Sequence, residues 1–147
     1  MTNSSEKPAI KPYERHNARQ MALQAVYEWQ MTGNDPASII QQFLDEGKKK
    51  IDNTYFSEVV EGVISHILTL DQAFQGFINN RTIDDLDQVD KAILRIATYE
   101  IIYHQELDYK IILNEAIELA KSYAAADSHR FVNGVLDKVV KDQGRKK

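Results

Sequence analysis

Two glutamates stand one helical turn apart at Glu115 and Glu118, and paired carboxylates can hold metal ions or transfer protons. A helical bundle that binds two metal ions uses Glu-x-x-His pairs on two helices, and no histidine in this sequence stands three residues after a glutamate. We therefore expect the two glutamates to form ion pairs with Lys110, with Lys121 or with residues of neighbouring helices.

Other catalytic arrangements are missing from the sequence. The four histidines are scattered, and the H-x-x-x-H spacing of a zinc-binding helix does not occur. There is no cysteine, which excludes a disulfide scaffold, a thiol nucleophile and a thiolate metal site. The nucleophile-elbow, Walker A and dinucleotide-binding patterns are also missing. We therefore expect a protein that is not an enzyme and that carries no metal or cofactor.

A basic segment opens the first expected helix. It has the sequence RHNAR at residues 15–19, and Lys7 and Lys11 precede it. Positive charges at a helix N-terminus oppose the helix dipole and cost about 0.3–1 kcal/mol each when they are exposed. A partner that carries phosphates would explain these residues, and a chance cluster of charges explains them equally well.

A second mixed segment, DSHRF at residues 127–131, combines an acidic residue, basic residues and an aromatic ring. It has a purely structural explanation, in which Asp127 or Ser128 caps a helix, Arg130 faces solvent and Phe131 joins the core. The segment also suits single-stranded RNA, because aromatic rings stack on bases and a carboxylate can accept a hydrogen bond from a base amino group. These residues alone favour the structural explanation.

Leu23 and Tyr27 lie one turn apart on the first expected helix, beside its main apolar stripe. The pair could widen the face that packs into the core, or it could anchor a partner protein if the two side chains are exposed. The spacing alone favours a place in the core.

The composition is that of one ordinary globular domain. The chain has 147 residues, of which 43% are hydrophobic, and its formal net charge is −4. This acidic balance excludes a generally basic nucleic-acid binder, and no apolar run approaches the roughly 18 residues of a membrane-spanning helix. The polar start of the chain has no signal-peptide pattern, so we expect a cytoplasmic protein that does not contact a membrane.

Apolar residues recur at helical spacing along most of the chain, and no stretch alternates with the period of a strand. Asp35 and Asp87 are expected to cap helices. The sequence therefore predicts an all-α fold of about seven helices. The expected organisation is a flexible N-terminal arm over residues 1–13, a single helical domain over 14–140 and a basic C-terminal tail over 141–147. The apolar stripes fall in residues 18–29, 39–44, 55–67, 70–78, 89–101, 110–123 and 131–139.

Four segments, in this order and spacing, resemble the NusB family of bacterial transcription antitermination factors. The likeness extends from residue 11 to about residue 140. The segments are RHNARQMALQAVYEWQ at residues 15–30, VDKAILRIATYE at 89–100, NEAIELAKSY at 114–123 and FVNGVLDK at 131–138.

The resemblance implies two small helical bundles packed together and a function in binding rather than catalysis. Members of the family pair with NusE, which is also a protein of the small ribosomal subunit. The heterodimer binds the boxA element of nascent RNA and helps to build an elongation complex that resists termination, notably on ribosomal RNA operons. We therefore expect the partners of this chain to be boxA RNA, NusE and, indirectly, RNA polymerase.

The resemblance also assigns site residues by position. The family's arginine-rich RNA-binding segment corresponds to Lys11, Arg15, His16, Asn17 and Arg19. Its second RNA-contacting stretch corresponds to Asp127, Arg130 and Phe131. The surface that faces NusE corresponds to Tyr27 and Asp90, with Leu23 beside Tyr27. The resemblance thus moves Tyr27 from the expected core to an expected interface.

The basic segment is thinner here than in much of the family, which often has consecutive arginines where this chain has His16 and Asn17. We therefore expect weak RNA binding by the chain alone and stronger binding with NusE. Two alternatives keep the fold. A NusB-like domain of an RNA cytosine methyltransferase would need a further domain and a catalytic cysteine that this sequence lacks. An assembly protein that binds NusE without touching RNA stays open.

Overall fold

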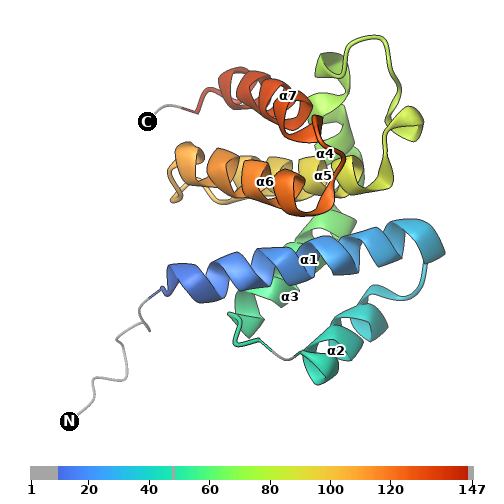
Figure 1. Cartoon of the computed structure of the whole chain (residues 1–147), viewed down its shortest axis with the longest axis vertical. Coiled ribbons are helices and arrows are strands. Elements are labelled where there is room, and N and C mark those ends of the chain that lie inside the picture. Colours follow the sequence, from blue (N-terminus) through green and yellow to red (C-terminus); the bar gives the residue numbers. More distant parts are fainter. Residues whose placement is uncertain (1–9, 48, 146–147) are drawn as a thin grey trace.

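Helices account for the regular structure of the chain in a computed structural model, which describes residues 10–47 and 49–145 (Figure 1). The all-α prediction is confirmed, since the described residues form seven α-helices and two short 3-10 helices and contain no strand. The α-helices are α1 (Pro12–Thr32), α2 (Pro36–Glu46), α3 (Asn53–Ser65), α4 (Ile67–Phe74), α5 (Gln88–Tyr103), α6 (Tyr109–Tyr123) and α7 (Ser128–Asp142). The 3-10 helices are η1 (Gln75–Phe77) and η2 (Ile83–Asp85).

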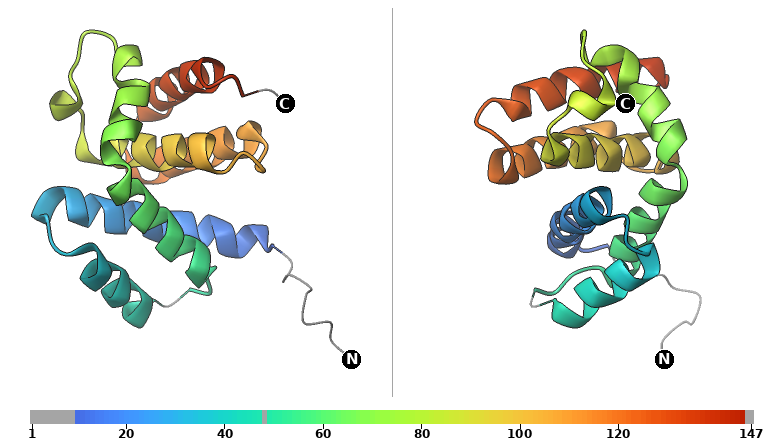
Figure 2. Two further views of the ribbon diagram at one scale, coloured as in Figure 1. Left: turned by 180° about the vertical axis from the view of Figure 1, so that it is seen from behind. Right: turned by 90° about the vertical axis from the view of Figure 1, so that its right-hand side faces the viewer.

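The helices form two groups that pack along one seam, as Figures 1 and 2 show from three sides. In the first group α1, α2 and α3 contact one another. In the second, α5 contacts α4, α6 and α7, and α7 also contacts α4 and α6. Helices α1 and α3 both pack on α5, so these three helices form the seam. The prediction of two packed bundles is confirmed.

Most helix starts follow local rules that the sequence reveals. The Asp35 carboxylate accepts a hydrogen bond from the Ser38 amide at 3.1 Å, and Asp87 accepts one from the Val89 amide at 2.9 Å. Each bond satisfies an amide that the first helical turn leaves without a partner. Asp127 stands at the start of α7 as expected, but its carboxylate makes no capping hydrogen bond.

The first helix begins earlier than the sequence pattern indicates. The expected arm covers residues 1–13, whereas α1 starts at Pro12. Proline suits this position because it has no amide hydrogen to leave unpaired and its backbone angle already fits a helix. Residues 1–9 of the expected arm, and Lys146 and Lys147 of the expected tail, lie outside the described residues.

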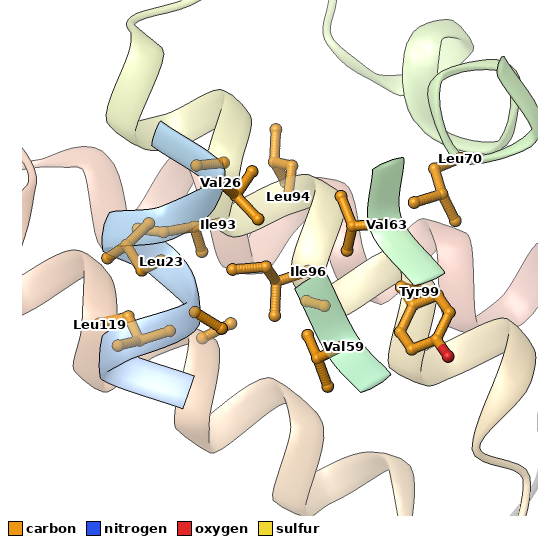
Figure 3. Packing of buried hydrophobic residues seen from close by; sticks show 14 of the residues in the cluster. Leu23, Val26, Val59, Val63, Leu70, Ile93, Leu94, Ile96, Tyr99 and Leu119 are labelled. Carbon is orange, nitrogen blue, oxygen red and sulfur yellow. The ribbon is translucent and has the colours of Figure 1, made fainter. Parts of the chain in front are cut away.

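Helix α5 is the centre of the core, and every residue from Asp90 to Ile101 on it is buried. Figure 3 shows aliphatic side chains of α1 and α3 meeting those of α5. The labelled side chains at this junction are Leu23, Val26, Val59, Val63, Ile93, Leu94 and Ile96. None of the described helices is long and apolar enough to cross a membrane.

Gly62 on α3 has no side chain, which lets α3 approach α5 closely. A Cβ atom at this position would overlap the ring of Tyr99, whereas a Cβ at Gly134 on α7 would meet open space. We expect Gly62→Ala to lower the free energy of unfolding by about 1–3 kcal/mol, because the ring and the helix must shift apart. The control Gly134→Ala should raise it by as much as about 1 kcal/mol, since alanine favours a helix. Urea denaturation of both variants measures the difference, and equal stability of the two would contradict the close approach.

Candidate RNA and partner interface

The start of α1 carries the basic segment. Some of its side chains lie at or near the surface, and others contact neighbouring elements. Lys11 is exposed and lies 3.7 Å from the Glu14 carboxylate. The Arg15 guanidinium lies over the Tyr55 ring, with its Cζ atom 3.8 Å from the ring centre, and its Nε atom is 3.6 Å from the Asp52 carboxylate. This part of the segment keeps positive charge at or near the surface.

The next two residues are tied to neighbouring elements. His16 Nδ1 lies 2.8 Å from the Glu115 carboxylate on α6. Asn17 is buried, and its side-chain amide donates to the Lys50 carbonyl oxygen at 3.1 Å. Their contacts therefore join α1 to α6 and to the loop before α3.

Arg19 is buried in the seam and is held by carboxylates. Its side chain is 4% exposed, and its Nε and Nη2 atoms lie 2.8–3.1 Å from the Glu100 oxygens. Tyr55 also donates a hydrogen bond to Glu100. Burial by itself lowers the pKa of Arg19, but the Glu100 carboxylate more than offsets this effect, so the guanidinium stays charged. In this structure Arg19 joins α1 to α5, and a phosphate could reach it only after the Glu100 pair opens.

Glu115 forms the expected contacts with a neighbouring helix, namely α1. Glu115 contacts His16, and it also lies 3.6 Å from Arg19 Nη1. No ion pair between Glu115 and Lys110 or Lys121 is present. Glu115 thus belongs to the seam that connects α1 with α6. Among the described residues no group of three or more histidines, cysteines, aspartates and glutamates could hold a metal ion.

The second expected RNA stretch lies at the start of α7 and is open to solvent. Asp127 and Arg130 are exposed, and Phe131 is half-buried. The Arg81 guanidinium lies over the Phe131 ring, with its Cζ atom 4.1 Å from the ring centre. Sequence reasoning missed Arg81, because it is a single arginine in a polar loop far from Phe131 along the chain. Together these side chains place two cations, one carboxylate and one ring on the same part of the surface.

Asp90 connects the expected partner surface with this second stretch. It is 6% exposed, and the Ser128 hydroxyl donates to its Oδ2 atom at 3.3 Å. The other carboxylate oxygen, Oδ1, is buried without a hydrogen-bond partner in the described part of the chain. Burial raises the pKa of Asp90 above its ordinary value, because the charged form loses hydration.

The expected partner residues Leu23 and Tyr27 meet at a small apolar hollow of about 200 Å³. Gln24, Val89 and Tyr123 complete its lining. Tyr27 is 39% exposed, whereas Leu23 is only 3% exposed. Leu23 therefore serves mainly the core, and Tyr27 is the accessible ring.

The structure does not bring the two expected RNA stretches into contact. The first lies beside the middle of α6, where His16 meets Glu115, and the second follows the end of α6 at Tyr123. At 1.5 Å per helical residue, Glu115 and Tyr123 are about 12 Å apart along the helix axis. The expected partner residues lie near the second stretch, because Asp90 contacts Ser128.

Comparison with known proteins agrees with this geometry. The model of the NusB family matches residues 16–141. The transcription antitermination protein NusB of Tolumonas auensis is 50% identical over 136 residues, covering 92% of this chain and 98% of the relative. The protein of the same name from Aeromonas hydrophila subsp. hydrophila is 48% identical over 138 residues, covering 93% and 100%.

Solved structures show the same fold. NusB of T. maritima has a TM-score of 0.82 at 27% identity, with 91% of this chain and 94% of that chain covered. A chain in the crystal structure of the antitermination factors NusB and NusE in complex with dsRNA has a TM-score of 0.81 at 25% identity. That match covers 90% of this chain and 99% of the other.

Proposed function

This chain belongs to the NusB family, and we propose that it is a transcription antitermination factor that binds boxA RNA as a heterodimer with NusE. The proposal is supported by relatives named for transcription antitermination and by the similar complex of NusB, NusE and RNA. The single observation that carries RNA contact is the half-buried Phe131 ring near the start of α7, with the exposed Arg81 guanidinium over it.

The second stretch would recognise bases. The Phe131 ring packs partly on the core and lies under the Arg81 guanidinium, and its exposed part could stack on a base. The exposed Asp127 carboxylate makes no hydrogen bond to the helix and can accept one from a base amino group. Arg130 and, at the distant start of α1, Lys11 and Arg15 would attract phosphates.

The partner surface would centre on Tyr27. An exposed tyrosine beside an apolar hollow is a frequent anchor at protein interfaces, because the ring buries a large area at low entropic cost. Asp90 follows Val89 of the hollow along α5, and its Oδ1 atom is buried without a hydrogen-bond partner among the described residues. We propose that NusE covers the hollow and packs beside Asp90. Such a complex would support ribosomal RNA operons through the RNA polymerase elongation complex.

We propose that the chain acts by binding and not by catalysis. The protein would work in the cytoplasm, where bacterial transcripts are made. The relatives are named for transcription antitermination and not for a reaction. Binding of RNA and of a ribosomal protein requires surfaces of the kind seen at α1 and α7, and it does not require a reactive side chain.

Removal of the Phe131 ring tests RNA contact. We expect Phe131→Ala to weaken binding of labelled boxA RNA to the heterodimer about 10- to 100-fold, because stacking on one base contributes about 1–3 kcal/mol. Phe131→Tyr keeps the ring and should bind within about threefold of the unchanged protein. Fluorescence anisotropy measures both affinities. If the alanine variant retains full affinity while NusE binding is normal, the chain is an assembly protein that does not touch RNA at α7.

A further inference from the structure

A single RNA strand that contacts both expected stretches must cross the surface between them. The basic segment of α1 meets the middle of α6 at Glu115, whereas α7 follows the end of α6. The direct route along the junction of α1 and α6 passes the Glu115 carboxylate, and Glu118 is exposed on the same helix. These acidic groups would repel phosphates, so the strand needs another path.

A groove along α1 offers that path. It has a volume of about 290 Å³ and lies between α1, the end of α2, the loop that follows and the end of α6. Asn17 lines one end, so the groove begins at the first expected RNA stretch. Tyr123 lines it too, four residues before Asp127 of the second stretch. The groove thus connects the two stretches that the fold keeps apart.

The side chains of the groove have the chemistry of a nucleotide site. Gln20 and Gln24 present amides one turn apart on α1, and amides pair with base edges through both their donor and their acceptor. Lys49 Nζ lies 3.4 Å from the Gln20 amide oxygen, which places a cation beside these amides. Tyr123 is 42% exposed and can stack on a base. The Glu46 carboxylate at the groove can accept from a base amino group.

We propose that this groove is a third RNA-contacting site, which holds part of the single strand as it passes from α1 to α7. The inference rests on the proposed function and adds Gln20 and Lys49 to the RNA surface. The polar lining distinguishes the groove from the apolar hollow at Tyr27, although Gln24 and Tyr123 border both. Because Gln20 and Lys49 line the groove and not the hollow, they test it separately from the partner surface.

The test measures affinity of the NusE heterodimer for labelled boxA RNA at several salt concentrations. Lys49→Gln should make the slope of log K against log salt about 0.7 shallower, which corresponds to one lost phosphate contact on a single strand. Gln20→Leu should weaken binding about three- to tenfold, because a base edge loses its hydrogen-bond partner. Affinity for NusE should stay within about twofold in both variants, since neither residue borders the hollow.

Two matched changes elsewhere are the controls. Lys141→Gln is the control for Lys49→Gln, because it removes one positive charge on α7, where Lys141 pairs with Asp137. Gln72→Leu is the control for Gln20→Leu, because it replaces an exposed glutamine of α4 with leucine. Both should leave RNA affinity and the salt slope unchanged. Unchanged RNA binding by the groove variants would overturn the groove site while leaving the proposed function intact. A loss of NusE affinity that matches the loss of RNA affinity would assign the groove to the partner and also overturn it. Absence of RNA binding by the unchanged heterodimer would instead overturn the proposed function.

Discussion

Replacing Arg19 with alanine is expected to lower the free energy of unfolding by about 3–5 kcal/mol, because it leaves a buried carboxylate without its cation. Glu100 is 1% exposed, and Arg19 is its only ion-pair partner among the described residues. A loss of this size is a large fraction of the stability of an ordinary domain, which is about 5–15 kcal/mol. Urea denaturation followed by circular dichroism measures it.

Two comparison variants identify the cause of that loss. Arg15→Ala removes a cation one turn earlier on α1, where the guanidinium stacks on Tyr55, and should cost only about 0.5–1 kcal/mol. The double change Arg19→Met with Glu100→Leu removes both charges and should recover most of the stability. If Arg19→Ala and Arg15→Ala cost the same small amount, Arg19 does not hold the seam and is available to RNA.

Tyr27→Asp is expected to weaken NusE binding at least 100-fold, or about 2.8 kcal/mol. The change removes an exposed ring from the edge of the apolar hollow and puts a charge there, which a partner would have to desolvate. The folded chain itself should be almost unaffected, because Tyr27 is 39% exposed and outside the buried core. Isothermal titration with purified NusE measures the affinity, and the melting temperature reports on the fold.

Met31→Asp is the matched control, since Met31 is one turn further along α1, is 56% exposed and does not line the hollow. It should leave NusE affinity within about threefold of the unchanged chain. Equal losses for the two variants would mean that general negative charge on α1 weakens binding. A large drop in melting temperature for Tyr27→Asp would return Tyr27 to the core.

The helices and their starts could be predicted because local rules determine them. Asp35 and Asp87 bond to amides two or three residues ahead, which the sequence displays directly. The start of α1 at Pro12 is earlier than the apolar pattern indicates, because Pro12 and Tyr13 do not extend the apolar stripe.

The burial of Arg19 could not be predicted from its neighbours in the sequence. The first helix shows a basic residue, while the carboxylate that neutralises it stands 81 residues later on α5. The Arg81 and Phe131 pair was hidden for the same reason, since contact between a loop and a helix leaves no periodic signal. Leu23 was assigned to the partner surface by position, whereas its burial depends on α5 packing against α1.

A single titration shows whether this chain and NusE bind RNA cooperatively. Labelled boxA RNA is titrated with the chain alone, with NusE alone and with the two together, and anisotropy gives the three affinities at one salt concentration. The basic segment of α1 offers few free cations, because Arg19 is buried and Lys11 stands beside Glu14. We predict that the mixture binds at least tenfold more tightly than either protein alone. An affinity of the mixture equal to that of the tighter single protein would contradict the account.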